Sequence, residues 1–423
     1  MIDIKLIREN PAQVKENMKH RGLALQPVDD VLSLDQKRRE TIRETEKLKN
    51  LRNVTSNEIA KMKKEGKDAS EKISAMKKTS DDIKKLDEEL AEIEKQINTK
   101  MLDVPNMMEE NVPKGKNEKE NVEVKHWGEK PGGDFKFLDH IQLGKKLDIL
   151  DFDTGAKITG SGFPFYKGKG AILERALINF MLDTHRQKGY TEVFTPFIVN
   201  RTSMEVTEKV PKFEEDMYRI EPDDLYAIPT AEVPIINIHR DEILKHSDLP
   251  VKYCGYTACF RREAGHYGKE TKGFLRVHQF NKVELVNFCK PDKSFTELEL
   301  MLEDATAIVE ALNIHYRVIE LCSGDLGFSS AKTFDIEVWS PAEEKFLEAS
   351  SISNFTDYQA RRAMIRYRPD EPKAKPEFVY ILNGSGLATS RLMVSLMESY
   401  QTPEGKIIVP KVLHKYTGFE IIG

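Results

Sequence analysis

The stretch ISAMKKTSDDIKKLDEELAEIEKQI, residues 73–97, decides the architecture of the N-terminal part of the chain. Its apolar residues recur at spacings of mostly three, four and seven, at Ile73, Met76, Ile83, Leu86, Leu90, Ile93 and Ile97. Such a repeat places one apolar stripe along a helix and forms the seam of a coiled coil. Residues 73–97 are therefore predicted to be one long helix with a partner.

The partner helix is predicted in residues 34–64, which contain no proline and carry Leu48, Leu51, Ile59 and Met62. The tetrapeptide EGKD at residues 65–68 is a turn signal between the two halves of the pattern. Two helices of roughly 30 residues would each be about 45 Å long at 1.5 Å per residue. The sequence thus predicts an antiparallel helical hairpin, a coiled-coil arm too thin to bury a core of its own.

Charge is distributed unevenly along this arm. Residues 36–78 hold 14 Lys and Arg against 7 Asp and Glu, a local balance of +7, whereas residues 79–96 are acidic. A solvated coiled-coil face explains this pattern, and so does a surface that neutralises the phosphates of a nucleic acid. The candidate RNA contacts on the arm are Arg38, Arg39, Arg43, Lys47, Lys61, Lys63 and Lys64.

Composition narrows the class of the whole chain of 423 residues. The net charge of −5 argues against a protein that coats itself with nucleic acid, although a local basic patch remains compatible with it. No run of 18 apolar residues exists, and the N-terminus lacks an apolar signal core, so neither a membrane span nor secretion is expected. The four cysteines form no CxxC pair, which favours a reducing cytoplasm and disfavours structural zinc.

The rest of the chain divides into a connector and a mixed domain. Residues 103–160 are interrupted by proline and glycine, and residues 161–423 have the composition of a domain with helices and strands. A helix is predicted over 170–188, and strands are predicted over 192–199, 254–263, 275–288, 333–339 and 378–382. Because few helices separate these strands, we expect an α+β fold with a largely antiparallel sheet flanked by helices. The expected domains are 1–102, 103–160 and 161–423.

The tracts FRRE at 260–263 and RVHQFNKVE at 276–284 flank a loop that contains three glycines and predict a β-hairpin. Alternation along a strand places Arg261 and Glu263 on one face and Arg262 on the other.

On the second strand of this hairpin, Phe280 and Glu284 share a face by the same alternation. One face of the sheet would then offer a guanidinium group, two carboxylates and an aromatic ring, which can hold a polyanion and stack a flat base. The alternative is an ordinary sheet face exposed to water.

Three further tracts offer suitable chemistry. Gly384-Ser385-Gly386 is expected to open an amphipathic helix in which Arg391, among apolar neighbours, needs an anionic partner or an exit to the surface. Glu348-Ala349-Ser350-Ser351 supplies hard oxygen ligands suited to Mg²⁺. Residues 229–234 (PTAEVP) place a hydroxyl and a carboxylate in a stiff turn that can bind an ammonium group or merely cap a helix.

Taken in order, these tracts resemble the class II aminoacyl-tRNA synthetases and, within them, the bacterial-type seryl-tRNA synthetase family, over essentially the full length. The helix ending at Gly189 with the strand bearing Pro196 resembles motif 1, which forms the dimer interface in the family. Residues 260–284 resemble motif 2, and residues 384–391 resemble motif 3. The N-terminal arm is the strongest discriminator, because the family uses such an arm to grip tRNA.

The resemblance implies roles for the residues of these motifs. It implies catalytic roles for Arg261, Glu263 and Arg391. It implies L-serine binding by Thr230, Ala231, Glu232, Arg261, Glu284 and Ser385. It implies ATP binding by Arg261, Arg262, Glu263, Val277, Phe280, Glu348, Ala349, Ser350, Ser351 and Arg391, with Mg²⁺ held by Glu348 and Ser351.

The implied activity is a serine–tRNA ligase that forms seryl-adenylate from serine and ATP and passes the seryl group to tRNA(Ser). Use of tRNA(Sec) stays open. The implied partners are tRNA, bound by the arm and by the loop from Ala264 to Gly273, and a second copy of the chain in a homodimer. One departure is Gly160-Ser161-Gly162-Phe163, where many members carry an arginine.

Two other functions compete with this one. A ligase that loads an amino acid onto a different carrier would usually lack the long arm. A synthetase-derived protein without catalysis would be expected to lose some of Arg261, Glu263, Glu348 and Arg391, and all four are present. No histidine is assigned a catalytic role, including His266 and His278.

Overall fold

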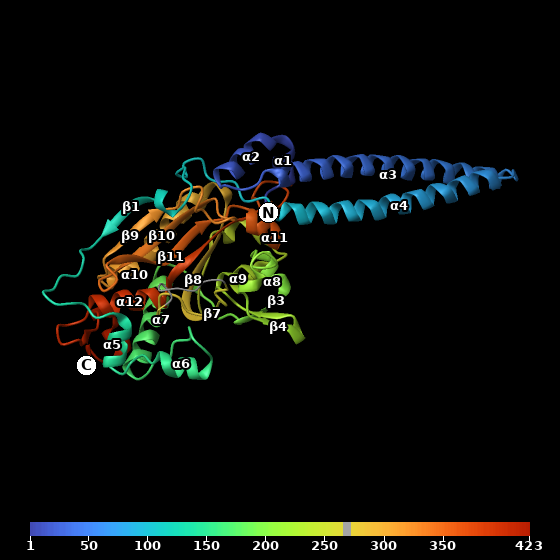
Figure 1. Ribbon diagram of the computed structural model, residues 1–423. Helices are drawn as coiled ribbons and strands as arrows, with labels where there is room; N and C mark the ends of the chain where they lie inside the picture. The colour runs from blue at the N-terminus through green and yellow to red at the C-terminus, as the bar shows by residue number, and fades with distance from the viewer. Residues whose placement is uncertain (265–271) are drawn as a thin grey trace. The chain divides into compact units, whose positions relative to one another are not determined.

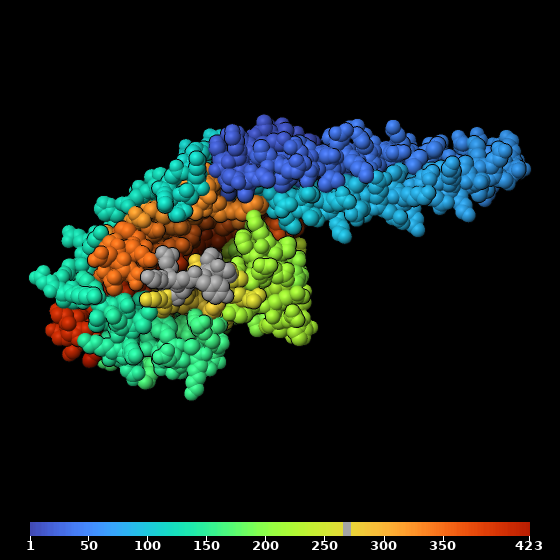
Figure 2. All heavy atoms as spheres, viewed as in Figure 1, coloured from blue at the N-terminus to red at the C-terminus, as the bar shows by residue number. Residues whose placement is uncertain are grey.

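The computed structural model describes residues 1–264 and 272–423, and the chain forms two compact units, residues 1–107 and 108–423. The N-terminal unit is helical, with α1 (Ile4–Glu9), α2 (Pro11–His20), α3 (Gln26–Lys64) and α4 (Ser70–Met101). Helices α3 and α4 form the predicted antiparallel hairpin around the turn at Gly66, whose φ of +69° explains the glycine. Figure 2 shows their side chains in contact along the hairpin.

The seam of the hairpin differs in part from the predicted apolar stripe. Ile59, Ile83, Ile93 and Ile97 are buried as expected, whereas Leu51 and Ile73 are 52% and 40% exposed. The buried positions near the base of α3 include threonines and the carboxylate of Asp35. Asp35 accepts two hydrogen bonds of 2.8 Å from Arg8 of α1, which lower the pKa of its carboxyl group. A buried ion pair therefore joins α1 to the base of the arm.

The larger unit is built on one eight-stranded sheet in the order β1-β9-β10-β11-β14-β8-β7-β2. All neighbours are antiparallel except the parallel pair β2–β7, which confirms the predicted sheet type. The strands are β1 (Val122–Trp127), β2 (Thr191–Glu192), β7 (Val251–Phe260), β8 (Gln279–Cys289), β9 (Tyr316–Glu320), β10 (Lys332–Ser340), β11 (Lys345–Asn354) and β14 (Tyr380–Ala388).

Helices cover both faces of this sheet (Figure 1). On one face α7 (Lys169–Gln187), α10 (Ser294–Ala311) and α12 (Thr389–Ser399) bury the main apolar core, which includes Leu285 of β8. On the opposite face α9 (Glu232–Ile236) and α11 (Tyr358–Ala363) pack on Val286 and Phe288. Side chains of β8 alternate between these faces, so Glu284 lies on the same face as Val286.

Smaller elements complete this unit. They are the helices α5 (His140–Lys146), α6 (Phe152–Ile158), α8 (Arg201–Val206) and α13 (His414–Thr417), and the short strands β3 (Ile198–Asn200), β4 (Arg219–Ile220), β5 (Leu225–Ala227), β6 (Ile243–Lys245), β12 (Arg366–Arg368), β13 (Glu377–Phe378), β15 (Ile407–Ile408) and β16 (Ile421–Ile422). Strand β1 comes from the segment expected to be a connector, and it pairs with β9. Among the described residues, no helix combines the length and the apolar character needed to cross a membrane.

Three predicted elements need correction. The strand expected over 192–199 is two short strands, β2 and β3, with Pro196 between them, since proline lacks the N–H that a ladder requires. The motif 2 strands have different bounds from those predicted: β7 ends at Phe260 instead of residue 263, and β8 begins at Gln279 instead of residue 275. The sequence Gly384-Ser385-Gly386 does not open a helix but lies inside β14, where Gly384 packs against the backbone of Ile352.

Candidate active site

A cavity of about 400 Å³ lies over β8, β11 and β14, beside α9, the start of α12 and the residues that follow β7. Thirteen of the fifteen residues predicted to bind serine or ATP line it: Thr230, Glu232, Arg261, Glu263, Val277, Phe280, Glu284, Glu348, Ala349, Ser350, Ser351, Ser385 and Arg391. Ala231 and Arg262 do not. The Arg262 side chain donates instead to the carbonyl of Glu215, outside the cavity. The described lining residues include no histidine or cysteine, so a protein nucleophile of the Cys–His kind is not assembled here.

One wall of the cavity presents a cation beside an aromatic ring. The guanidinium carbon of Arg261 lies 5.0 Å from the centroid of the Phe280 ring. Its Nε donates to the carbonyl of Pro229 at 3.2 Å, and its backbone N–H donates to His278 at 2.9 Å. Bonds to other described residues use only Nε and the backbone N–H, which leaves the remaining guanidinium donors to meet an anion.

Glu263 reaches the cavity by a different route from the one predicted. Strand β7 has already ended, and Glu263 lies in the left-handed region with a φ of +50°. Its carboxylate forms an ion pair with Arg276, a cavity residue that the sequence analysis missed. The alternation argument therefore predicted the right side for Arg261, Arg262 and Glu263 although these residues follow the strand.

The deep end of the cavity holds two buried carboxylates. Glu232 pairs with Lys209 at 3.1 Å and accepts a hydrogen bond of 2.7 Å from Gln359. Glu284, which is 2% exposed, pairs with Lys282 on the same strand face, and burial raises the pKa of its carboxyl group. These pairs balance two negative charges with two positive ones, which makes such deep burial tolerable.

The hydroxyl of Thr230 lies near both carboxylates, because it accepts from Lys282, the partner of Glu284, and from the backbone N–H of Glu232 at 3.3 Å. Lys282 donates to Thr230 Oγ1 at 2.6 Å, and Thr230 precedes α9, which starts at Glu232. A small ligand that carries an ammonium group would find carboxylate and hydroxyl acceptors together at this end. The backbone carbonyl of Ser385 lies beside it, held by a 2.6 Å hydrogen bond from Ser350.

The opposite end carries Arg391 and Glu348. Arg391 is the third residue of α12, and its Nη1 donates to the backbone carbonyl of Glu348 at 2.8 Å and lies 3.4 Å from the Glu348 carboxylate. The predicted need of Arg391 for an anionic partner is thereby met, and both side chains stay partly exposed, at 31% and 50%. With Ser351 in the same wall, this end offers a cation for phosphate and hard oxygens for a divalent ion.

The glycine-rich departure near residue 162 has a packing reason. Gly162 has a φ of +81°, and a Cβ there would lie 2.4 Å from the His278 ring. His278 in turn contacts the carbonyl of Arg261 through Nδ1 at 2.9 Å and stacks on Phe163. His278 therefore shapes the backbone beneath Arg261. His266 and residues 265–271 of the predicted tRNA-contacting loop lie outside the described residues.

The arm residues predicted to bind RNA fall into two groups. Arg38 pairs with Glu94 at 3.1 Å and Arg39 pairs with Asp35 at 3.1 Å, so both are engaged within the unit. The others are exposed and make no ion pair with the described residues: Arg43, Lys47, Lys61, Lys63 and Lys64.

Sequence reasoning missed several residues of the cavity, among them Lys209, Arg276, Lys282 and Asn383. For Lys282 a signal existed, because it alternates with Phe280 and Glu284 on one strand face. For Lys209 there was none, because a loop from a distant part of the sequence brings it to Glu232.

Comparison with protein families gives two matches. Residues 1–108 match the seryl-tRNA synthetase N-terminal domain, and residues 212–400 match the tRNA synthetase class II core domain (G, H, P, S and T). Among curated proteins, the serine–tRNA ligase of Chloroherpeton thalassium is 59% identical over 428 residues, with both chains covered completely. That of Carboxydothermus hydrogenoformans is 52% identical, covering 100% of this chain and 99% of its own.

Solved structures agree. The seryl-tRNA synthetase from Pyrococcus horikoshii, complexed with ATP, superposes with a TM-score of 0.95 at 40% identity and covers 100% of this chain and 99% of its own. The cytoplasmic serine–tRNA ligase from Naegleria fowleri, in complex with AMP, gives a TM-score of 0.89 at 34% identity, with 100% and 98% covered.

Proposed function

The chain belongs to the seryl-tRNA synthetase family, and from that premise we propose how its residues divide the work of an ATP-dependent serine–tRNA ligase. The observation that carries the proposal is the cavity, which has carboxylates and a hydroxyl at one end and guanidinium groups at the other. Serine carries an ammonium group and a carboxylate, and ATP carries a polyphosphate. The acidic end therefore suits the ammonium group of serine, and the basic end suits the polyphosphate of ATP.

The serine subsite is assigned to the deep end. Glu284 and Thr230 accept from the ammonium group, Glu232 holds the side-chain hydroxyl, and Ser385 closes the pocket. Arg261 lies between the subsites and binds the serine carboxylate and the α-phosphate together, which its free guanidinium donors allow. Ala231 is not assigned a contact with serine, because it does not line the cavity.

The ATP subsite is assigned to the outer end. Phe280 stacks on the adenine ring, while Glu263 contacts the adenine amino group and Val277 contacts the ring through backbone atoms. Arg391 binds the terminal phosphate of a bent ATP, and Ala349 and Ser350 support the wall. Arg262 is not assigned a contact with ATP, because its side chain points to Glu215.

Magnesium fits the chemistry of this end. Glu348 and Ser351 would hold it through one carboxylate and one hydroxyl, leaving its other positions to phosphate oxygens and water, as is usual for Mg²⁺ with nucleotides. The ion would neutralise charge on the phosphates. Both oxygens lie in the wall that also carries Arg391.

The reaction needs positioned charge rather than a protein nucleophile. A serine carboxylate oxygen attacks the α-phosphorus of ATP, the bond to the bridging oxygen breaks, and pyrophosphate leaves with that electron pair. A terminal ribose hydroxyl of tRNA then attacks the acyl carbon, and AMP leaves. Arg261 stabilises the charge on the α-phosphate in the first step, which is the preorganised contribution expected of such sites.

Two partners are proposed with this function. The exposed basic residues of the arm, from Arg43 to Lys64, bind the phosphate backbone of tRNA(Ser).

A second copy of the chain is proposed to cover a groove of about 450 Å³ beside α7, where Phe194 is 80% exposed. An exposed phenylalanine on a groove lined by Tyr166, Ile178 and Leu182 favours an apolar partner surface.

Aminoacylation of tRNA(Ser) with labelled serine tests the proposal. Charging that requires serine, ATP and magnesium together supports it, and a parallel reaction with tRNA(Sec) tests the second acceptor. Charging with another amino acid at equal efficiency would contradict the assignment of the deep end to serine.

A further inference from the structure

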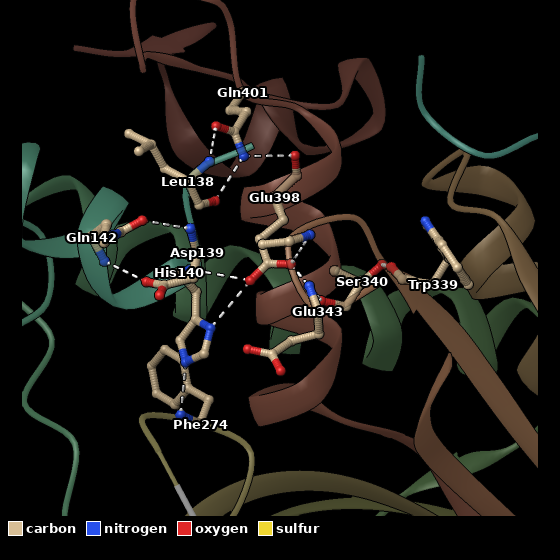
Figure 3. Close-up of polar contacts among 12 residues, drawn as sticks. Leu138, Asp139, His140, Gln142, Phe274, Trp339, Ser340, Glu343, Glu398 and Gln401 are labelled. Carbon is tan, nitrogen blue, oxygen red and sulfur yellow. Dashed lines mark hydrogen bonds and ion pairs between the residues drawn. The ribbon is translucent and has the colours of Figure 1, made fainter. Parts of the chain in front are cut away.

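A buried polar network lies behind the cavity wall (Figure 3). Its centre is Glu398 in the last turn of α12, which is fully buried, and His140, the first residue of α5, which is 1% exposed. Glu398 Oε1 accepts from the backbone N–H of His140 at 3.1 Å and lies 3.2 Å from the ring Nδ1. Its other oxygen accepts from the hydroxyl of Ser340 and from the N–H of Ala342.

The far nitrogen of the His140 ring touches the cavity wall. Nε2 accepts a hydrogen bond from the backbone N–H of Phe274 at 3.1 Å, and the two rings stack with centroids 5.8 Å apart. The Glu398 carboxylate can only accept and the Phe274 N–H can only donate. Both bonds form together only when the imidazole ring is neutral and carries its proton on Nδ1.

The adjacent glycine is adapted to this contact. Gly273 has a φ of +57°, and a Cβ there would lie 2.1 Å from Nε2 of His140. Any other residue at 273 would therefore push the imidazole away from Phe274. The ring of Phe274 is fully buried and also stacks on Tyr166 and packs edge-on against Phe152, so the wall is fixed from behind on several sides.

What this contact fixes is a run of four consecutive cavity residues, Phe274 to Val277. Arg276 in this run pairs with Glu263, and Arg391 donates through Nε to the carbonyl of Leu275 at 3.3 Å. The run thus touches the groups assigned to ATP. The serine subsite comes from β8, β14 and the turn before α9, outside this run.

We propose that His140, held in its Nδ1–H form by Glu398, is a positioning residue for ATP, because its Nε2 fixes the Phe274–Val277 wall of the nucleotide subsite. The proposal rests on the assignment of that end of the cavity to ATP. His140 touches no substrate and acts only through Phe274. The competing explanation is that the network serves stability alone, by anchoring α5.

Two substitutions at residue 140 separate these explanations. In His140→Asn the side-chain amide replaces Nδ1 and can still donate to Glu398, but the acceptor for Phe274 is lost. In His140→Gln the carbonyl oxygen replaces Nε2 and can still accept from Phe274, while the bond to Glu398 is lost. A matched control is Gln401→Ala, which removes two 2.9 Å bonds to Leu138 beside the same helix and leaves Phe274 untouched.

The measurement is serine-dependent ATP–pyrophosphate exchange on the full-length protein, with KM determined separately for ATP and for serine. We expect His140→Asn to raise the KM for ATP about 10-fold, the scale of leaving a buried N–H unsatisfied, with the KM for serine unchanged. We expect His140→Gln and Gln401→Ala to keep the KM for ATP of the unmodified protein, whatever their melting temperatures.

Other results would overturn the inference. An unchanged KM for ATP in folded His140→Asn would mean that the network only stabilises the fold. A KM for ATP that rises in His140→Gln but not in His140→Asn would mean the same. If His140→Asn does not fold, Gly273→Ala replaces it, because its Cβ would push the imidazole away from Phe274; an unchanged KM for ATP in that variant rejects the proposal. Absence of exchange in the unmodified protein would instead reject the proposed function, so the two failures are distinct.

Discussion

Among single residues, Arg261 has the most direct role in the proposed chemistry. Its side chain lines the cavity, whereas that of its neighbour Arg262 donates to the carbonyl of Glu215, so the chain supplies a matched pair of substitutions. Arg261→Ala should slow adenylate formation at least ~100-fold, the usual scale for removing a preorganised charge contact. Arg262→Ala should stay within a few-fold of the unmodified protein. Single-turnover measurement of adenylate formation checks both, and equal losses in the two variants would contradict the placement.

Glu284 gives the site a pH dependence. Burial raises the pKa of its carboxyl group above the usual value of 4.5. Only the charged form holds the ammonium group, so the KM for serine should rise as the pH falls through this raised pKa and stay constant at higher pH. The contribution of Glu284 to the free energy of unfolding changes in the opposite direction to the affinity for serine. It rises as the pH falls, because burial penalises the charged form and protonation removes that penalty.

Exchange kinetics from about pH 5 to 8 test this dependence, with Glu284→Gln as the comparison. The substituted protein should bind serine weakly at every pH and lose the acidic rise. An acidic rise of the same size in Glu284→Gln would assign the titration to another group.

At the scale of elements, the arm should act on tRNA and not on adenylate formation. Arg43→Glu with Lys47→Glu should lower kcat/KM for tRNA and reduce the salt dependence of binding, because each phosphate contact releases counterions. ATP–pyrophosphate exchange should not change. Lys95→Glu on the acidic part of α4 is the control. An equal loss of tRNA charging in this variant would mean that the total charge of the arm matters, and not the surface around Arg43 and Lys47.

Helix α12 should depend on the carboxylate at its end. Four donors point at the two oxygens of Glu398, and the amide of Glu398→Gln cannot accept all four. We expect the free energy of unfolding to fall by about 2 kcal/mol, the scale of a buried donor left unsatisfied. Urea unfolding measures this fall, with the exposed Glu299→Gln as a control expected within ~0.5 kcal/mol. Equal stability of both variants would contradict the description of the network.

The elements show where prediction from sequence succeeds. The arm and its turn could be predicted because periodicity and an uninterrupted helical pattern are local properties. The place of Gly384-Ser385-Gly386 could not, because glycines that open a helix and glycines that let a strand approach Ile352 look alike in sequence. Lys209 and Gln359 were likewise hidden, since their contacts with Glu232 join segments far apart in the chain.

At the scale of the whole molecule, we expect a homodimer through the groove beside α7. Sedimentation equilibrium should give twice the chain mass of 48.5 kDa. Phe194→Glu should shift the protein toward the monomer, since a charge cannot be buried against an apolar partner surface without a large penalty. A monomer at micromolar concentration in the unmodified protein would reject the proposed interface.

The central claim is that the cavity activates serine with ATP. Serine-dependent ATP–pyrophosphate exchange without tRNA, run beside threonine, alanine and glycine, tests it most directly. Alanine should be rejected because it leaves Glu232 without a partner hydroxyl, and threonine should be rejected by the shape of the pocket. We expect strong exchange with serine alone. Equal exchange with threonine or alanine, or none with any amino acid from folded protein, would contradict it.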